Sequence, residues 1–259
     1  MSLMRTHQKR LAASGGPDAE SLSAGARVLG IMPQGLMGGS KLAAMLAASL
    51  EEDLKALHEV ASVERKAALK RDTLLPKYRD YVARLMGEGK GHELIGYYVV
   101  WAFDAGAIEE ALQVAFWCLE HGQDLPERFK SPMALFVAMQ TLAWAEAEYN
   151  AGRGFEPYLG TVLASMVAEG GDAEAWDVPD RIKAGYYRLV GLQAEKTGDL
   201  DGAASNLERA MALGGKVKTA LDAVRKRQER GDKQLNSADG TGGASTSGAP
   251  GSEAETTGS

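Results

Sequence analysis

The chain has 259 residues, of which 45% are apolar, and carries a formal net charge of −6 at pH 7. These numbers fit a globular protein and argue against one that coats nucleic acid over its whole surface, although a local basic patch is still possible. No apolar run reaches the ~20 residues of a membrane-spanning helix, and no apolar segment follows the basic start MSLMRTHQKR, so neither a membrane anchor nor a signal peptide is expected. The single cysteine, Cys118, rules out an internal disulfide and fits a reducing cytosol.

Residues 1–39 are rich in Gly, Ser and Ala and contain two breaker clusters, SGGPD and MPQGLMGGS. We expect a flexible arm here, which carries the basic residues Arg5, Lys9 and Arg10. The glycine-rich GLMGGSK at 35–41 lacks the Gly-Lys-Ser/Thr ending of a phosphate-binding loop, so we interpret it as a hinge before a helix.

A long apolar stripe follows the arm and predicts one amphipathic helix over 41–71. The first half of this helix is acidic and the second half is basic, an order that suits the helix macrodipole. A narrow stripe on so long a helix needs a partner, in this chain or in another copy of it. Four leucines are predicted to supply contacts between copies: Leu46, Leu50, Leu54 and Leu57.

Positive charge gathers at 65–79, where six Lys or Arg residues accompany a single acidic residue, Asp72. The six are Arg65, Lys66, Lys70, Arg71, Lys77 and Arg79. The cluster is either a solvated helix face or a surface that meets a polyanion. A second basic segment at 216–233 has the same two interpretations. Its members are Lys216, Lys218, Arg225, Lys226, Arg227, Arg230 and Lys233.

Helical patterns continue through the rest of the chain. Apolar periodicity, breakers and prolines predict helices at 76–86, 92–104, 108–121, 132–150, 156–169, 180–197, 200–213 and 216–232. No stretch alternates apolar and polar residues as a half-buried strand would. The predicted fold class is therefore all-α, with a long N-terminal amphipathic helix followed by helical hairpins.

Two segments of equal length repeat one pattern: GAIEEALQVAFWCLEHG at 106–122 and GDLDGAASNLERAMALG at 198–214. Each begins and ends on Gly, and each follows a helix that contains GYY, at 96–98 and at 185–187. The pattern is typical of a tetratricopeptide hairpin, but the second copy starts 92 residues after the first, far from the ~34-residue period of that repeat. We expect two similar hairpins rather than a solenoid.

The sequence thus divides into the arm, a helical domain at 40–233 and a tail at 234–259. Within the domain, 40–86 is expected to serve oligomerisation and to face a polyanion, 92–214 to form the hairpin body and 216–233 to form a basic helix. The tail has no aromatic residue and is expected to be disordered, because it cannot bury enough surface to offset the entropy of ordering.

No complete catalytic or metal-binding pattern appears, and no cofactor is expected. The histidines do not pair with each other or with Cys118 at ligand spacing, and this cysteine lies in the apolar run AFWCLEH, where a buried core thiol is the simplest interpretation. PDRIK at 179–183 is similar to part of a Mg²⁺ nuclease site, but a helical pattern follows it where a strand is required. The aromatic residues at helical spacing are expected to pack in the core.

Three stretches together resemble the small terminase subunit of P-two-type temperate tailed phages: LLPKYRDYV, VVWAFDAGAIEEALQVAFWCLEHGQDLP and GDLDGAASNLERAMAL. The resemblance runs in order over about 41–230. Its most specific positions are Trp101, Asp104, Gly106, Ile108, Ala111 and Leu112, followed by Gly122 and Pro126.

The resemblance implies a subunit that recognises double-stranded phage DNA in the host cell cytoplasm, assembles with itself into a ring and regulates a large subunit with ATPase and nuclease activity. Since the sequence contains no complete nuclease site, we expect no catalytic centre in this chain and take the family label "endonuclease subunit" to describe the holoenzyme. DNA contacts are then expected from the arm and from the cluster at 65–79, with 216–230 as the second candidate. The alternative from the residues alone is a helical-hairpin adaptor that binds a protein partner.

Overall fold

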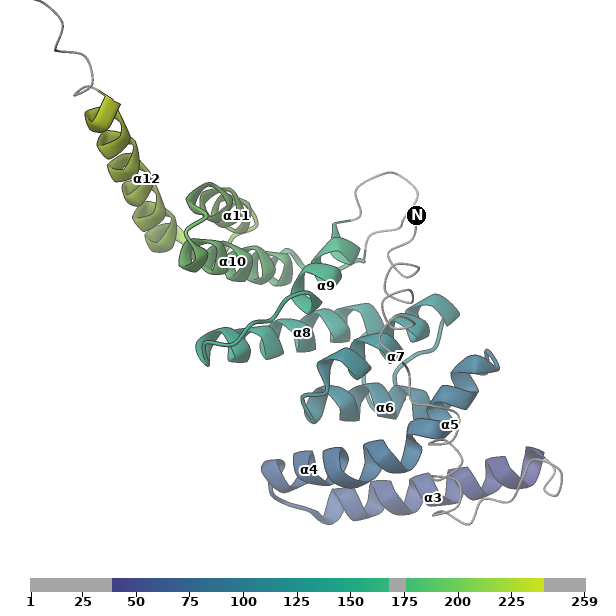
Figure 1. Cartoon of the computed structure of the whole chain (residues 1–259). Helices are drawn as coiled ribbons and strands as arrows, with labels where there is room; N and C mark the ends of the chain where they lie inside the picture. The colour runs from purple at the N-terminus through teal and green to yellow at the C-terminus, as the bar shows by residue number, and fades with distance from the viewer. Residues whose placement is uncertain (1–38, 168–175, 240–259) are drawn as a thin grey trace, which may run out of the picture. The chain divides into compact units, whose positions relative to one another are not determined.

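The computed structural model describes residues 39–167 and 176–239, and its regular elements are helices (Figure 1). No strand occurs in these residues, which confirms the predicted all-α class. The chain forms two compact units, one ending at Ala61 and the other beginning at Ser62. The predicted arm lies almost wholly outside the described residues, as does the end of the predicted tail, 240–259.

Helix α3 (Gly39–Glu59) belongs to the first unit. It does not continue to residue 71 as the sequence predicts, because a second helix, α4 (Val63–Leu69), starts after Ser62. The Ser62 side chain accepts a hydrogen bond from the backbone N–H of Arg65 at 3.3 Å, and an acidic residue, Glu64, follows in the first turn. These are N-terminal helix signals, and here they prevail over an apolar stripe that runs on without interruption.

Helix α4 leads through a π-helical turn, η1 (Lys70–Leu74), into α5 (Leu75–Gly87). Pro76 lies in the first turn of α5, where an ordinary α-helical turn would bring its ring against the carbonyl four residues earlier. The wider turn avoids this clash, and the N–H of Leu75 bonds to the carbonyl of Lys70. The result is one uninterrupted helical segment, 63–87, that buries Leu74, Leu75, Tyr78 and Val82.

Helices α6 (Glu93–Asp104) and α7 (Ile108–His121) form the first hairpin (Figure 1). The His92 side chain caps α6 by accepting a hydrogen bond from the N–H of Leu94 at 3.1 Å. Every residue of α6 from Leu94 to Ala102 is buried, so this helix is the centre of the core. Trp101 packs between Tyr78 and Tyr97, with ring centroids 5.7 and 5.9 Å away.

Helix α8 (Met133–Asn150) packs on α7, and the short α9 (Tyr158–Met166) packs on α8. The second hairpin, α10 (Asp180–Thr197) and α11 (Leu200–Ala212), packs on α8 through α10. Helix α12 (Lys218–Asp239) then packs on α11 and extends past the predicted end at 232.

Leu207, Val217, Leu221 and Val224 share one apolar cluster with Tyr187, so α10, α11 and α12 have a common core. The two predicted hairpins are therefore confirmed. Among the described residues, no helix is both long enough and apolar enough to cross a membrane.

Candidate nucleic-acid interface

The basic cluster at 65–79 lies on α4, η1 and α5, and its members have different surroundings. Lys70 forms an ion pair with Asp104 at the end of α6, and only 13% of the lysine side chain is exposed. Arg71 pairs with its neighbour Asp72, at 2.9 and 3.1 Å. Lys77 is half-buried, and its ammonium lies 5.2 Å from the centre of the Tyr78 ring. For Lys70 and Arg71, much of the positive charge is already matched within the chain.

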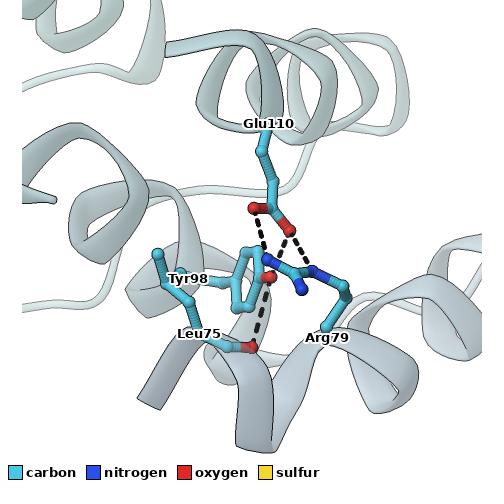
Figure 2. Close-up of polar contacts among 4 residues, drawn as sticks. All are labelled: Leu75, Arg79, Tyr98 and Glu110. Atoms are coloured by element: carbon cyan, nitrogen blue, oxygen red, sulfur yellow. Dashed lines mark hydrogen bonds and ion pairs between the residues drawn. The ribbon is translucent and has the colours of Figure 1, made fainter. Parts of the chain in front are cut away.

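Arg79 is held most firmly, by a two-pronged ion pair with Glu110 of α7 at 2.8 and 2.9 Å (Figure 2). The Tyr98 hydroxyl donates to the same carboxylate and lies 3.4 Å from the carbonyl oxygen of Leu75. The contacts among Arg79, Tyr98 and Glu110 therefore join α5, α6 and α7. Paired, hydrogen-bonded charges of this kind fix helix positions, and Arg79 is less available to a phosphate than its 54% exposure suggests.

The pKa shifts of Arg79, Tyr98 and Glu110 follow from these contacts. The hydrogen bonds that Arg79 donates to Glu110 raise the pKa of Arg79, and burial together with the bond to Glu110 raises the pKa of Tyr98. For Glu110, burial raises the pKa, but the hydrogen bonds from Arg79 and Tyr98 outweigh it, so its pKa lies below the ordinary value. All three groups therefore keep their charge states near neutral pH, and a proton-transfer role is not indicated.

A groove of about 730 Å³ opens beside this ion pair and is lined by residues of α5, α6, α7 and the start of α9. Its apolar lining is Val82, Ala83, Met86, Ala107, Ile108 and Val114. Arg79, the one cation among the described residues that line the groove, is already paired. The groove is therefore suited to apolar groups and not to a phosphate backbone.

Arg65 and Lys66 on α4 differ from these residues. Arg65 is exposed and Lys66 is half-buried, and neither forms an ion pair with any residue that the structure describes. Of the predicted cluster, these two offer positive charge that the described chain does not match. Arg5, Lys9 and Arg10 lie outside the described residues.

The second basic segment divides in the same way. Arg225 pairs with Glu208 at 2.8 Å and Arg227 pairs with Glu195 at 3.0 Å, which fastens α12 to the second hairpin. Four others are exposed and form no ion pair within the described part of the chain: Lys216, Lys218, Lys226 and Arg230.

The residues weighed for catalysis take structural positions. Cys118 is buried, and this burial raises the pKa of its thiol to about 12. Asp180 of PDRIK is the first residue of α10, so the stretch opens a helix and not a strand. No group of three or more His, Cys, Asp or Glu residues is arranged to hold a metal ion within residues 39–167 and 176–239.

The positions that carry the resemblance are explained by the fold. Trp101 is fully buried, and Asp104 binds Lys70. Gly106 and Gly122 both have positive φ, 74° and 64°, in the turns that begin and end α7. A side chain would be strained at these two positions, so the glycines have a physical reason.

Sequence reasoning missed the cross-helix pairs Lys70–Asp104 and Arg79–Glu110. The one local signal is that Glu110 stands beside the buried stripe of α7, next to Ala111, where an unpaired carboxylate would be costly. That signal shows that a partner is needed without showing which residue supplies it.

Comparison with known proteins gives the chain its relatives. Residues 47–181 match the phage small terminase subunit family. The chain is 30% identical to the terminase, endonuclease subunit of Escherichia phage P2 over 189 residues, which cover 72% of this chain and 71% of that protein. It is 23% identical to the probable terminase, endonuclease subunit of Haemophilus phage HP1 over 194 residues, which cover 74% of this chain and 67% of the relative. No solved structure matches the chain.

The family match begins within α3 and ends at the start of α10, so it includes the whole helical segment from α4 to α5 and the first hairpin. The expected resemblance to small terminase subunits of P2-type phages is confirmed by this match and by both relatives. The chain belongs to the phage small terminase subunit family.

Proposed function

We propose that this chain is the DNA-recognising subunit of a phage terminase and that it acts in packaging the viral genome in the host cell cytoplasm. It binds double-stranded phage DNA as a homo-oligomeric ring and regulates a large subunit that carries the ATPase and the nuclease. Family membership supports the packaging role. The observation that carries the DNA contact is the pair Arg65 and Lys66, whose charge no described residue matches.

Two cations on one turn of α4 suit phosphate contacts better than base contacts. Each lysine or arginine that neutralises a phosphate releases counterions, so binding depends steeply on salt. Such contacts position the protein on the duplex without reading its sequence. In a ring, every subunit would present the same pair, and the contacts would add along the DNA.

The test is a double charge reversal, R65E/K66E, measured by fluorescence anisotropy with a labelled DNA duplex over a range of salt. We expect binding to weaken at least tenfold and the salt slope to fall by roughly two, about 0.9 for each phosphate that is no longer neutralised. The matched control is K55E/K130E, which makes the same charge change at two exposed lysines elsewhere. Unchanged binding by R65E/K66E would remove α4 from the interface.

The relatives are named endonuclease subunits, and we propose that this chain nevertheless has no nuclease site of its own. Support comes from PDRIK, which begins a helix instead of following the strand that such a site uses. Purified chain incubated with plasmid and Mg²⁺ is expected to leave the DNA intact, and cleavage is expected once the large subunit is added. Cleavage by the chain alone, abolished in D180N, would overturn this part of the proposal.

The ring is proposed to use the leucine stripe of α3. Leu46, Leu50 and Leu57 are buried within a single chain and Leu54 is half-buried, which leaves Leu54 as the member with most surface to offer a second copy. Light scattering should give one large closed oligomer, and L54E should lower its mass, while K55E at the next, exposed position should not. A monomer that binds no DNA would favour the helical-hairpin adaptor instead.

A further inference from the structure

We propose a second DNA-backbone contact, at the end of the second hairpin where α10 and α12 both begin. The proposal rests on the proposed function, because it assumes that the chain binds DNA. It adds a surface that is distant in sequence from α4. It narrows the second candidate segment, 216–230, to its start, and it assigns a role to PDRIK, which the sequence left unexplained.

The fold brings these two stretches together. A Cβ atom placed on Gly215 would lie 3.4 Å from the Cβ of Ala184, so the loop between α11 and α12 touches the first turns of α10. Val217 and Tyr187 then share one buried cluster. Residues 180–184 and 214–218 therefore form one end of the three-helix unit.

Five cations gather at this end. Arg181 and Lys183 come from the first turn of α10, and Lys216 and Lys218 come from the start of α12. Arg209, in the last turn of α11, lies over the Tyr187 ring with its guanidinium 5.7 Å from the ring centre. All except Lys183 are exposed, and within the described residues none of the five forms an ion pair.

Acidic residues reduce this charge without cancelling it. Asp177 and Asp180 are exposed near the start of α10, and Asp222 is exposed one turn after Lys218. Glu208, next to Arg209, is already paired with Arg225. With that ion pair set aside, the residues described at this end include five cations and three carboxylates. Further along α12 the balance differs, because Arg225 and Arg227 are paired with carboxylates of the hairpin.

An excess of unmatched Lys and Arg on three converging helices suits a chain of phosphates better than a single anion. The contacts would come from long and mostly exposed side chains, so they fit a phosphate backbone and offer no base readout. The ligand we assign is duplex DNA, bound through its backbone with a strong dependence on salt.

The experiment compares K216E/K218E with K55E/K130E, two double charge reversals at exposed positions, the second pair outside both basic segments. Both are made in the full chain, and binding to a labelled duplex is measured across a salt series. We expect K216E/K218E to weaken binding about tenfold and to lower the salt slope by roughly two. The control K55E/K130E should stay within about twofold of the wild type. R181E, which alters the α10 side of the same surface, should weaken binding as well.

The outcomes separate this proposal from the one on α4. Weaker binding by K216E/K218E alone supports the second contact, even if R65E/K66E has no effect. Wild-type binding by K216E/K218E, or an equal loss in the control, overturns the local surface and leaves the proposed function standing. If the wild-type chain binds no duplex at low salt, both proposals fail together.

Discussion

The two helical hairpins, α6–α7 and α10–α11, share a short sequence pattern but differ in where they place large and small buried side chains. Between α10 and α11, Leu207 lies against Gly191, with its Cγ 2.9 Å from where a glycine Cβ would be. The positions 92 residues earlier hold Ala115 and Val99, both fully buried. At these equivalent sequence positions, the larger residue is on the second helix of one hairpin and on the first helix of the other.

The shared GYY triplets teach a related point. Gly96 comes ten residues before the turn glycine Gly106, but Gly185 comes thirteen residues before Gly198. The triplets are therefore offset by three residues, which is nearly one helical turn and keeps them on a similar face. Their neighbours differ: Gly96 meets the loop after α7, and Gly185 meets a side chain of α8. Identical short motifs therefore occupy different structural positions in the two hairpins.

The largest expected effect is the loss of Leu207, which is fully buried. L207A should lower the free energy of unfolding by about 3 kcal/mol, because Gly191 opposite has no side chain with which to fill the cavity. Urea unfolding measures this, and M211A, at a position 42% exposed on the same helix, is the control and should stay within about 0.5 kcal/mol. Adding G191A to L207A should recover part of the loss, whereas G191A alone should destabilise.

The GYY glycines should respond unequally to alanine. A Cβ on Gly96 would lie 2.8 Å from the Cδ of Pro126 and 2.9 Å from the carbonyl oxygen of Asp124, two groups that cannot easily move. G96A should therefore cost about 2 kcal/mol of unfolding free energy. A Cβ on Gly185 would meet only the far end of Leu142, which can rotate, so G185A should be close to neutral. Urea unfolding of both variants measures the difference, and the reverse order would contradict the idea that the two glycines have different neighbours.

Much of this architecture could be predicted from the sequence, because long helices with strong periodicity have clear ends. Helices α7 and α10 begin and end where the pattern indicates, and glycines follow both. The break between α3 and α4 was not predicted. The signal at Ser62 is confined to one helical turn, whereas the apolar stripe that argues for continuity extends over many residues.

The site could be predicted only in part. Composition locates the basic clusters, but the distribution of free charge depends on partners 31 and 34 residues away, Glu110 for Arg79 and Asp104 for Lys70. Periodicity within one helix carries no information on such pairs. For the same reason, the contact between residues 180–184 and 214–218 could not be predicted, because it depends on how α12 packs on α11.

The next effect in size concerns the ion pair that ties the first hairpin to α5. E110Q should lower the free energy of unfolding by about 1.5 kcal/mol at neutral pH, because Arg79 loses a charged acceptor while the shape is kept. The second hairpin has a counterpart, Arg188–Glu146, which ties α10 to α8. Comparing the two pairs tests whether burial decides how much an ion pair contributes.

The pH dependence of this effect has a definite sign. The folded chain holds the pKa of Glu110 below its ordinary value of 4.5, so the stabilisation is fully present above that pH. It is lost as the pH falls through the lower, folded pKa. Unfolding curves of the wild type and E110Q should therefore differ at pH 6 and converge in acid. A constant difference down to pH 2 would show that the carboxylate charge is not the cause.

The smallest effect is expected for E146Q. Arg188 and Glu146 are 3.3 Å apart, and both side chains are 44% exposed, whereas Glu110 is 24% exposed and also accepts from Tyr98. Water and salt screen an exposed pair, so E146Q should change the unfolding free energy by less than about 0.5 kcal/mol, and 1 M salt should abolish the difference. If E146Q instead costs as much as E110Q, then exposure does not distinguish the pairs. The two ion pairs would then contribute equally to the free energy of unfolding, and the two hairpins would differ only in the packing of their cores.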